Sequence, residues 1–462
     1  MITIICNDNS QKEREYIYDV IFKEFLGIEY KVIYEKREDV LIKCDNAILY
    51  MSDQFFQQSQ DCWLGEESLP QLPLRIESVH EEIRYLVTEE KLPIIYGDKI
   101  TSGLFSALSD NNTRCTLDIF GSAFFMLTRY EEIVNQERDQ YDRFSAKSSI
   151  AFKENFLHRP IINEYIELLW GWIHSAAPHI QRKKHKYRIM PTHDVDVPYL
   201  ALSLNIFQKI KTLLGAIIKR RNWWEFKENL QLFLKASMSD YSSDPRDNFD
   251  YIMGLSEKYK LTSSFYFMTA RGRDIKDGNY NIVAPPIVEL AKKIIARGHN
   301  IGIHPGFGSY KKIEYVENDV KLLRGMLQKF SLKINKFGGR QHYLSWEAPT
   351  TWELYEENGI EYDTTLSYAD CIGFRCGICW DYPVYNCIKH EAYRLREYPL
   401  IVMDCTLWDK CYMDLDKKEM LSRCVKLKEK CQKYEGNFVI LWHNTSFMEL
   451  WQRELYESIL NS

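Results

Sequence analysis

The stretch THDVD, residues 192–196, places three titratable side chains directly after YRIMP, where a basic segment turns apolar. Burying a carboxylate without a partner is costly, so a strand that delivers two of them indicates a metal, a cation or a proton-transfer task. Residues two apart on an extended strand share a face, so the side chains of Asp194 and Asp196 can point into one site while Val195 points away. The alternative is an exposed turn whose Asp residues cap a following helix.

Titratable residues recur at three further points where an apolar run ends. They are His304 in GIHPGFG, Arg340 and His342 in GGRQHY, and His443 in FVILWHN. From Pro245 onward, strand-like and helical patterns alternate, which predicts a parallel sheet or barrel built from right-handed crossovers. In such folds the carboxyl ends of the strands meet at one edge, and the catalytic and binding residues lie there.

The elements expected around these residues follow from the period of the apolar positions. Strands are predicted in 262–269, 300–306 and 334–343, and helices in 248–261, 285–299, 315–330 and 350–360. Before them, one helix is predicted over 118–134 with Asp118 as its cap, and another over 160–177. The segment 204–237 is amphipathic and basic with Trp223 and Trp224 at its centre; a solvated helix that covers a core is the first interpretation, and contact with a membrane surface is the alternative.

Length and charge limit the classes of protein to consider. At 462 residues the chain exceeds what one core serves, and the basic link PHIQRKKHKYR predicts an accessory α/β domain at 1–180 and a second domain at 187–462. The net charge of -5 does not favour nucleic acid as a partner. The N-terminus has no signal-peptide pattern and the twelve cysteines are scattered, so a cytoplasmic location is expected, with a peripheral membrane contact left open.

The order of these motifs resembles the polysaccharide deacetylase family, the carbohydrate esterases of family 4 type with a NodB homology domain. THDVD is similar to the first motif of that family, RGHNIGIHPG to the second, RQHY to the third and VILWH to the last, over about 187–450. The N-terminal region, through LPIIYG, DIFGSAFFMLTRYEEI and FLHRPIINEYI, resembles the domain that precedes such modules in bacterial polysaccharide biosynthesis proteins. The resemblance implies an α/β fold with a C-terminal deformed (β/α) barrel.

The resemblance also implies a divalent metal, zinc foremost. Asp196 and His304 would be two of its ligands. The family's second histidine, four residues after the first, is replaced here by Gly308, and a catalytic zinc normally has three protein ligands. His342, two residues after Arg340 at a strand end, is the candidate for the third, with His193 as its rival although strand alternation turns His193 away.

The same resemblance assigns the catalytic roles. Asp194 would be the general base, Arg340 would orient and charge-stabilise it, and His443 would be the general acid. Tyr343 stands where a backbone amide of the family helps to hold the oxyanion. Structural roles are the alternatives, since Arg340 can be an ion-pair partner and His443 a hydrogen-bonded core residue. The acidic partner of His443 stays open between Asp363 and Asp404.

The function expected from these residues is metal-dependent hydrolysis of a C–N or ester bond. The enzyme would remove acyl groups, acetyl foremost, from a sugar or polysaccharide precursor, nucleotide- or lipid-linked, during surface polysaccharide biosynthesis. Two alternatives remain. One is a carbohydrate-binding or assembly protein on a catalytically degenerate fold, which Gly308 favours. The other is a metal amidohydrolase that acts on a small C–N substrate.

Overall fold

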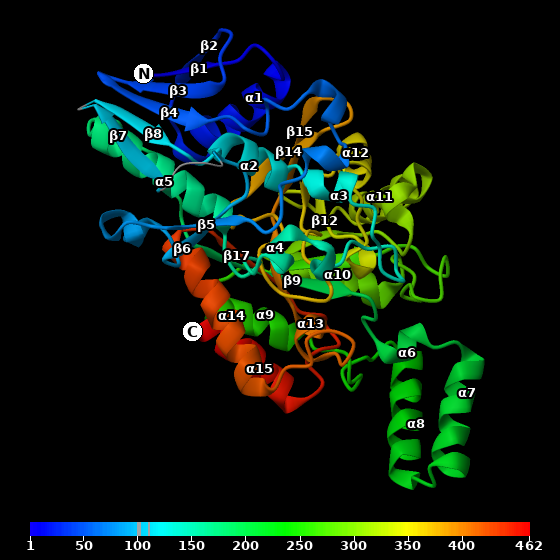
Figure 1. Ribbon diagram of the computed structural model, residues 1–462. Helices are drawn as coiled ribbons and strands as arrows, with labels where there is room; N and C mark the ends of the chain where they lie inside the picture. Colours follow the sequence, from blue (N-terminus) through cyan, green and yellow to red (C-terminus); the bar gives the residue numbers. More distant parts are fainter. Residues whose placement is uncertain (99–102, 110) are drawn as a thin grey trace.

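The structure is a computed structural model that describes residues 1–98, 103–109 and 111–462 (Figure 1). A six-stranded sheet lies within the first 115 residues, and a nine-stranded sheet extends from residue 188 to residue 441. A small antiparallel pair, β5 (Arg75–Ser78) and β6 (Lys91–Ile94), forms a further sheet. The predicted mixed α/β architecture is confirmed.

The six-stranded sheet has the order β2-β1-β3-β4-β8-β7 and mixes parallel and antiparallel pairs. Its strands are β1 (Ile2–Cys6), β2 (Tyr30–Tyr34), β3 (Asp39–Cys44), β4 (Ala47–Ser52), β7 (Phe105–Ser109) and β8 (Asn112–Cys115). The helices of this region are α1 (Gln11–Tyr18), the π-helical η1 (Asp19–Leu26), α2 (Ile119–Leu127), α3 (Tyr130–Val134), α4 (Ile150–Lys153) and α5 (Ile161–Ala176). Short 3-10 turns are η2 (Gln60–Cys62), η3 (Glu66–Ser68), η4 (Glu81–Leu86) and η5 (Ala146–Ser148).

The helix predicted over 118–134 is divided into α2 and α3. Asp118 caps α2 as expected, because its carboxylate accepts the N–H of Gly121 at 2.8 Å. The prediction of one continuous helix is wrong because Arg129 adopts a left-handed conformation, with φ of 54°. There its buried guanidinium donates to Glu132 and to the backbone carbonyl of Arg375, which lies far along the chain. The break in the helix therefore serves a long-range contact.

The nine-stranded sheet has the order β14-β15-β13-β12-β11-β10-β9-β17-β16 and is parallel except for the β14–β15 pair. In this order β14 and β16 are edge strands, so the sheet is open by its strand pairing. The predicted barrel stays a prediction. The strands are β9 (Arg188–Val195), β10 (Ser264–Met268), β11 (Asn300–His304), β12 (Gly338–Gly339), β13 (Tyr362–Asp363), β14 (Tyr382–Asn386), β15 (Glu391–Glu397), β16 (Leu400–Met403) and β17 (Asn437–Leu441).

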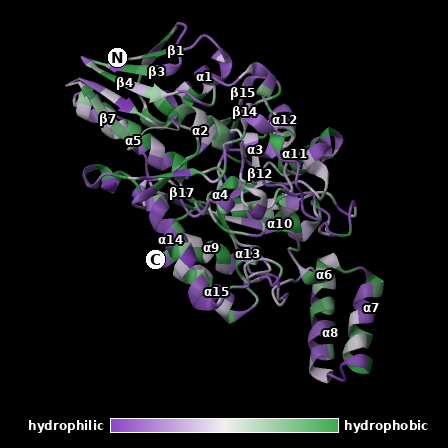
Figure 2. Ribbon diagram, in the orientation of Figure 1, coloured by the Kyte–Doolittle hydropathy of each residue, from purple (hydrophilic) through white to green (hydrophobic). Residues whose placement is uncertain are grey.

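Helices follow the central strands in the alternation that the sequence predicts. They are α9 (Phe249–Lys258), α10 (Pro285–Ala296), α11 (Ile313–Lys329), α12 (Thr350–Glu357), α13 (Asp404–Trp408), α14 (Lys417–Lys433) and α15 (Leu450–Asn461), with the 3-10 turns η7 (Ser309–Lys311) and η8 (His342–Leu344). In α10, buried Ile287, Ala291 and Ile294 recur at helical spacing and form the face that packs on the core. Figure 2 shows the mixture of apolar and polar residues along these helices.

The strand predicted over 334–343 is much shorter than expected. Only Gly338 and Gly339 form β12, and the chain then turns into η8. A Cβ atom on Gly338 would lie 2.0 Å from the ring of Tyr362 on the neighbouring strand, so glycine is required for the close approach. The strand ends at Gly339, and Arg340 to Tyr343 lie in the loop at the carboxyl edge of the sheet.

The amphipathic segment 204–237 is not a helix that covers the main core. After the short α6 (Leu200–Ser203), it forms a hairpin of α7 (Ile206–Leu214), the π-helical η6 (Gly215–Lys219) and α8 (Trp223–Ser237). The hairpin projects from the body of the molecule, at the lower right of Figure 1. Within it, Leu232, Phe233 and Ala236 pack in a small cluster of their own. None of the helices in the described part of the chain is both long and apolar enough to span a bilayer.

The N-terminal and C-terminal parts of the chain share one hydrophobic core, whose buried residues run from Ile2 to Leu460. A buried ion network also joins them, since Glu132 accepts from Arg129 at 2.8 Å and from Arg375 at 2.9 Å. The segment 178–187, which contains the predicted boundary, has no helix or strand. Division into domains at 1–180 and 187–462 stays a prediction.

Candidate active site

The predicted site residues lie at the carboxyl ends of neighbouring strands. Parallel pairing aligns Thr192 of β9 with Leu441 of β17, and Met268 of β10 with His304 of β11. Asp194 is in β9 and Asp196 follows it, His304 ends β11, Arg340 follows β12, and His443 comes two residues after β17. The structure therefore brings the seven predicted residues, including His342 and Tyr343, to one edge of the sheet.

Alternation along β9 separates the side chains of THDVD as expected. Thr192 and Asp194 face the same side, because both accept from the guanidinium of Arg340. His193 is buried on the other side, where Nδ1 contacts the carbonyl of Trp442 at 2.7 Å and Nε2 the hydroxyl of Ser263 at 3.3 Å. Both ring nitrogens of His193 are thus engaged away from the site, which excludes it as the rival ligand.

Asp196, His304 and His342 bring three ligand atoms together. Asp196 Oδ1 lies 3.3 Å from His304 Nε2 and 3.9 Å from His342 Nε2, and one ligand atom from each residue lies within 4.8 Å of the others. Asp196 Oδ1 and His304 Nε2 are buried atoms that make no hydrogen bond within the described residues. Burial alone would raise the pKa of Asp196, but the neighbouring His304, His342 and His443 hold it well below its ordinary value, so the carboxylate is an anion.

The other nitrogen of each histidine is fixed by an acceptor. His304 Nδ1 lies 2.7 Å from the carbonyl oxygen of Arg340, and His342 Nδ1 lies 3.1 Å from Asp277 Oδ1. This leaves both Nε2 atoms directed at Asp196, the arrangement that orients metal-ligating imidazoles. One carboxylate oxygen and two imidazole nitrogens are suitable ligands for a divalent ion such as zinc. Two of these three atoms, Asp196 Oδ1 and His304 Nε2, are buried without a hydrogen bond within the described residues. Asp277 was not predicted, because nothing in its loop DIKDGNY marks it as a partner of a distant histidine.

Gly308 supplies no ligand at the position of the family's second histidine. Its φ is 75°, in the left-handed region, and a Cβ atom there would face open space. His342 reaches the cluster from a different local structure than the extended strand predicted, because it lies in η8. The turn continues with Tyr343 at φ of 63°, so a tight turn, and not strand alternation, directs His342 toward Asp196.

Asp194 is held by a buried arginine. Arg340 is fully buried and donates to Asp194 Oδ1 and to Thr192 Oγ1, both at 2.9 Å, and to the carbonyl of Thr364 at 3.0 Å. The second carboxylate oxygen, Asp194 Oδ2, lies 3.7 Å from His304 Nε2. One oxygen of Asp194 is therefore tethered, and the other faces the cluster.

His443 is oriented by Asp404, which settles the choice left open with Asp363. Asp404 Oδ1 lies 2.7 Å from His443 Nδ1, and Oδ2 accepts the backbone N–H of His443 at 2.7 Å. Burial would lower the pKa of His443, but the adjacent Asp404 carboxylate raises it well above its ordinary value. Nε2 of His443 lies 3.8 Å from Asp196 Oδ2, so a protonated imidazole faces the site. Asp363 instead accepts from the backbone N–H of Thr365 at 2.9 Å.

Asp404, Cys405 and His443 form a second group with ligand-type atoms within 4.8 Å of one another. In this group the carboxylate already binds His443, and Cys405 Sγ lies 3.9 Å from His443 Nδ1. Burial raises the pKa of the Cys405 thiol, which disfavours the thiolate that a metal requires. The Asp196 cluster is therefore the better candidate metal site.

A loop from the N-terminal part of the chain completes the edge of the site. Arg143 donates to the backbone carbonyl of Tyr343 at 3.0 Å and to the hydroxyl of Tyr412 at 3.2 Å. The ring of Tyr343 contacts those of Tyr141 and Phe307 with centroid distances of 5.2 and 5.3 Å. This contact could not be predicted from local sequence patterns, because Arg143 and Tyr343 are 200 residues apart and belong to different predicted domains.

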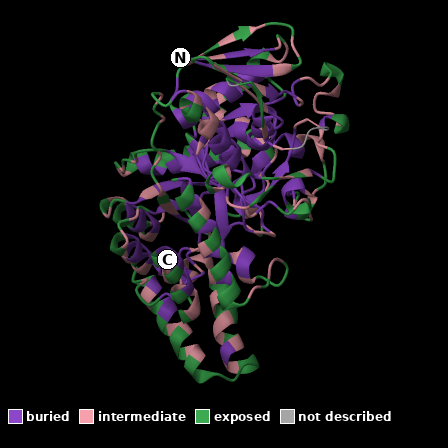
Figure 3. Ribbon diagram, turned by 60° about the vertical axis from the view of Figure 1, so that its left-hand side comes forward, coloured by how far each residue is buried: buried purple, intermediate pink, exposed green. Residues whose placement is uncertain are grey.

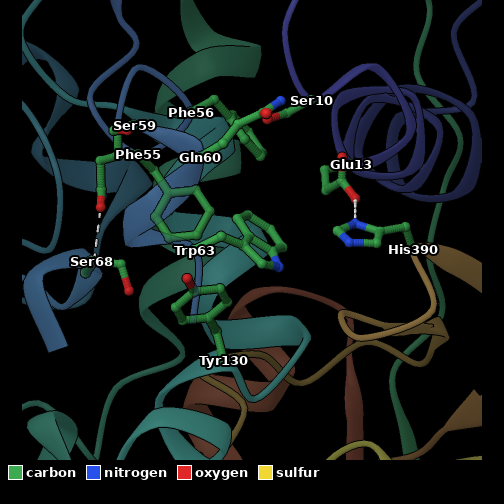
Figure 4. Close-up of a pocket in the computed structure, with 11 residues that line it drawn as sticks. Ser10, Glu13, Phe55, Phe56, Ser59, Gln60, Trp63, Ser68, Tyr130 and His390 are labelled. Carbon is green, nitrogen blue, oxygen red and sulfur yellow. Dashed lines mark hydrogen bonds and ion pairs between the residues drawn. The ribbon is translucent and has the colours of Figure 1, made fainter. Parts of the chain in front are cut away.

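A separate cavity of about 330 Å³ lies away from these residues and is lined by the N-terminal part of the chain and by His390 (Figure 4). Phe55, Trp63 and Tyr130 line one side, and the Glu13–His390 contact of 2.6 Å closes another. None of the seven predicted site residues lines it. It is therefore distinct from the candidate active site.

Comparison with known proteins gives one family and several distant structures. Residues 2–178 match a family model described as a family of unknown function, DUF7033. No curated protein sequence matches the chain. Among solved structures, the chain is similar to a putative polysaccharide deacetylase from Mycobacterium smegmatis, at 14% identity over 61% of this chain and 85% of that one, with a TM-score of 0.39.

Two further solved structures are similar to the chain at lower identity. One is a CE4 family pseudoenzyme from Bacillus anthracis, at 8% identity over 60% of each chain, with a TM-score of 0.30. The other is an allantoinase, at 11% identity over 60% of this chain and 87% of that one, with a TM-score of 0.37. At TM-scores this low the similarities are distant, and the candidate active site rests on its own geometry.

Proposed function

We propose that this protein is a divalent-metal-dependent hydrolase that removes acyl groups, acetyl foremost, from a sugar or polysaccharide precursor. The observation that carries the proposal is the convergence of one carboxylate and two imidazole nitrogens, Asp196 with His304 and His342. An arginine-tethered carboxylate and an aspartate-oriented histidine flank this cluster on separate strand ends. A purely structural role gives no reason for these groups to meet at one partly exposed edge.

Asp196, His304 and His342 would hold the ion, and zinc suits their donor set. A bound divalent ion supplies Lewis acidity toward an acyl carbonyl oxygen and lowers the pKa of a water molecule. Asp277 and the Arg340 carbonyl keep the two imidazoles oriented for this task.

Asp194 is suited to act as the general base. Its Oδ2 faces the cluster and can accept a proton from the water whose oxygen attacks the acyl carbon. Arg340 fixes the other oxygen and keeps the carboxylate in position. The backbone N–H of Tyr343, beside His342, is the proposed donor to the oxyanion that forms on the acyl oxygen.

His443 is suited to act as the general acid. Asp404 binds Nδ1, so the proton available for transfer is on Nε2, which faces the site. When the bond from the acyl carbon to nitrogen or oxygen breaks, this proton passes to the leaving amine or alkoxide. The raised pKa of His443 keeps that proton in place near neutral pH.

Half-buried aromatic rings beside the cluster support a carbohydrate substrate. Tyr141, Phe307, Tyr343 and Tyr412 lie at the edge of the site with part of each side chain accessible. Such rings offer an apolar face together with, in tyrosine, a polar hydroxyl, which matches the alternating C–H and O–H groups of a sugar.

Purified protein loaded with zinc would test the proposal on two panels, acetylated sugars and cyclic ureides. Release of acetate from an acetylated sugar is expected, with loss of activity in a chelator and recovery on adding zinc. If only cyclic ureides are hydrolysed, the substrate is a small cyclic C–N compound and not an acylated sugar. A protein that binds no divalent metal and releases no acetate would contradict the proposal.

A further inference from the structure

We propose that the projecting hairpin, residues 205–238, docks on an anionic membrane surface through its closed end. The closed end is defined here as residues 218–224, IKRRNWW, which join η6 to α8. The proposal concerns the hairpin alone and does not depend on the hydrolase reaction.

The closed end of the hairpin exposes large apolar side chains to solvent. All seven of its residues are exposed, and the exposed fractions are 72% for Ile218, 63% for Trp223 and 71% for Trp224. Figure 3 shows the end of the hairpin exposed while the body of the protein is largely buried. Tryptophan is the residue that prefers the interface between lipid headgroups and acyl chains, so an adjacent exposed pair indicates membrane contact.

An apolar stripe on α7 continues the closed end toward the body. Phe207, Ile210, Leu214 and Ile218 are all exposed, and their spacing of three and four residues places them on one helical face. Leu234 on α8 and Met238 directly after it are exposed as well. The hairpin packs its own inner face through Leu232 and neighbouring residues, so this outer stripe is left without a partner in the described structure.

The charge of the hairpin is opposite to that of the rest of the chain. Of the 60 basic and 65 acidic residues of the protein, the hairpin holds seven basic and two acidic, a net +5 against -10 for the remainder. Arg220 pairs with Glu225 at 2.8 Å, whereas no carboxylate pairs with Lys219 or Arg221 within the described residues. Unpaired cations beside exposed tryptophans complement anionic lipid headgroups.

Other occupants fit these features less well. A second copy of the hairpin would bring two +5 segments together, and like charges repel. A nucleic acid would pair with the cations but would leave the apolar stripe of Phe207, Ile210 and Leu214 in water. A membrane with anionic lipids satisfies the charges and buries the apolar side chains at once.

The base of the hairpin is fixed to the body, so docking would hold the protein in a defined orientation. Asp244, which follows α8, is buried and accepts the backbone N–H groups of Leu200 and Ala201 at 3.0 and 2.9 Å. Asn279 donates to the carbonyl of Ser203 at 3.2 Å. Asp244 thereby joins the two ends of the hairpin to each other, and Asn279 joins one of them to the loop that follows β10.

Cosedimentation of the full chain with lipid vesicles tests the proposal. The probes are vesicles of phosphatidylcholine alone and vesicles in which part of it is replaced by phosphatidylglycerol. We expect binding to the anionic vesicles, weakening as the NaCl concentration rises. Trp223→Ala/Trp224→Ala and Lys219→Glu/Arg221→Glu should each lower the partition coefficient by about tenfold or more, since each basic residue and each interfacial aromatic contributes separately.

Two control variants change similar residues elsewhere on the surface. Tyr85, 71% exposed, matches Trp224, and the exposed pair Lys333 and Lys336 matches the cations. Tyr85→Ala and Lys333→Glu/Lys336→Glu should bind vesicles as the wild type does, and all four variants should keep the wild-type midpoint of thermal unfolding. Absence of vesicle binding by the wild type would overturn the proposal, as would an equal loss in the controls. Lipid-free self-association or oligonucleotide binding that the closed-end variants abolish, without vesicle binding, would also overturn it.

Discussion

Asp277→Asn tests whether His342 is a metal ligand supported by a second carboxylate. Asp277 Oδ1 lies 3.1 Å from His342 Nδ1 and also accepts the backbone N–H of Phe307 at 2.7 Å. Asparagine keeps an acceptor oxygen for both and removes only the negative charge. Without that charge the Nε2 lone pair of His342 is less basic, and loss of such a partner typically weakens metal affinity by about 10–100-fold, or about 1.4–2.7 kcal/mol.

Zinc affinity would be measured by competition with a chromophoric chelator for the wild type, Asp277→Asn and Asp277→Ala. The Asn variant should fall at the lower end of the range, and the Ala variant should lose more because Phe307 also loses its acceptor. Asp274→Asn, in the same loop, is the matched control and should leave the affinity unchanged, because the Asp274 carboxylate accepts the backbone N–H of Lys276 in its own loop. Wild-type affinity in folded Asp277→Asn and Asp277→Ala would refute the assignment of His342 as a supported ligand.

Three further outcomes are expected. Asp194→Asn should keep zinc binding and lose most turnover, because the amide cannot accept the proton of water, and wild-type kcat would contradict its role as base. Asp404→Asn should lower the pKa of His443 and move the alkaline limb of the kcat/KM profile to lower pH, so an unmoved limb would contradict its role as acid. Burial lowers the pKa of His193 to about 4 from 6.5. The unfolded chain therefore takes up a proton below pH 6.5 that the folded chain does not, and stability present above pH 6.5 falls by up to about 3 kcal/mol toward pH 4. Urea unfolding of His193→Gln across this range should show a correspondingly flatter pH dependence, and a slope equal to that of the wild type would be inconsistent with this reading.

The sequence predicted the strand ends well because alternation and burial act locally. Asp194 and His193 face opposite sides of β9 as period-two alternation requires. Helices such as α9 and α10 lie where the apolar spacing placed them, since each must bury one face against the sheet.

The errors arose where a distant part of the chain decides the local structure. Arg129 breaks the predicted helix to reach Arg375, and a glycine is required at position 338 because the ring of Tyr362 on the neighbouring strand lies against it. Neither partner can be identified from local sequence patterns. Asp277 and Arg143 were missed for the same reason, because each acts on a residue far away in the chain.

The hairpin shows a different limit of sequence patterns. The amphipathic pattern of 204–237 correctly predicts helix, but it does not tell whether the apolar face meets the core or remains exposed. The chain reverses at Arg221, with φ of 47°, between η6 and α8, and neither a proline nor a glycine stands at the turn itself.

A crystal structure of the protein soaked in zinc, with anomalous differences measured at the zinc edge, would show whether Asp196, His304 and His342 bind a metal ion. We expect one strong peak bound by Asp196 Oδ1, His304 Nε2 and His342 Nε2, with metal–ligand distances of roughly 2.0–2.2 Å. A peak at the group of Asp404, Cys405 and His443 instead, or no peak within reach of Asp196, would contradict it.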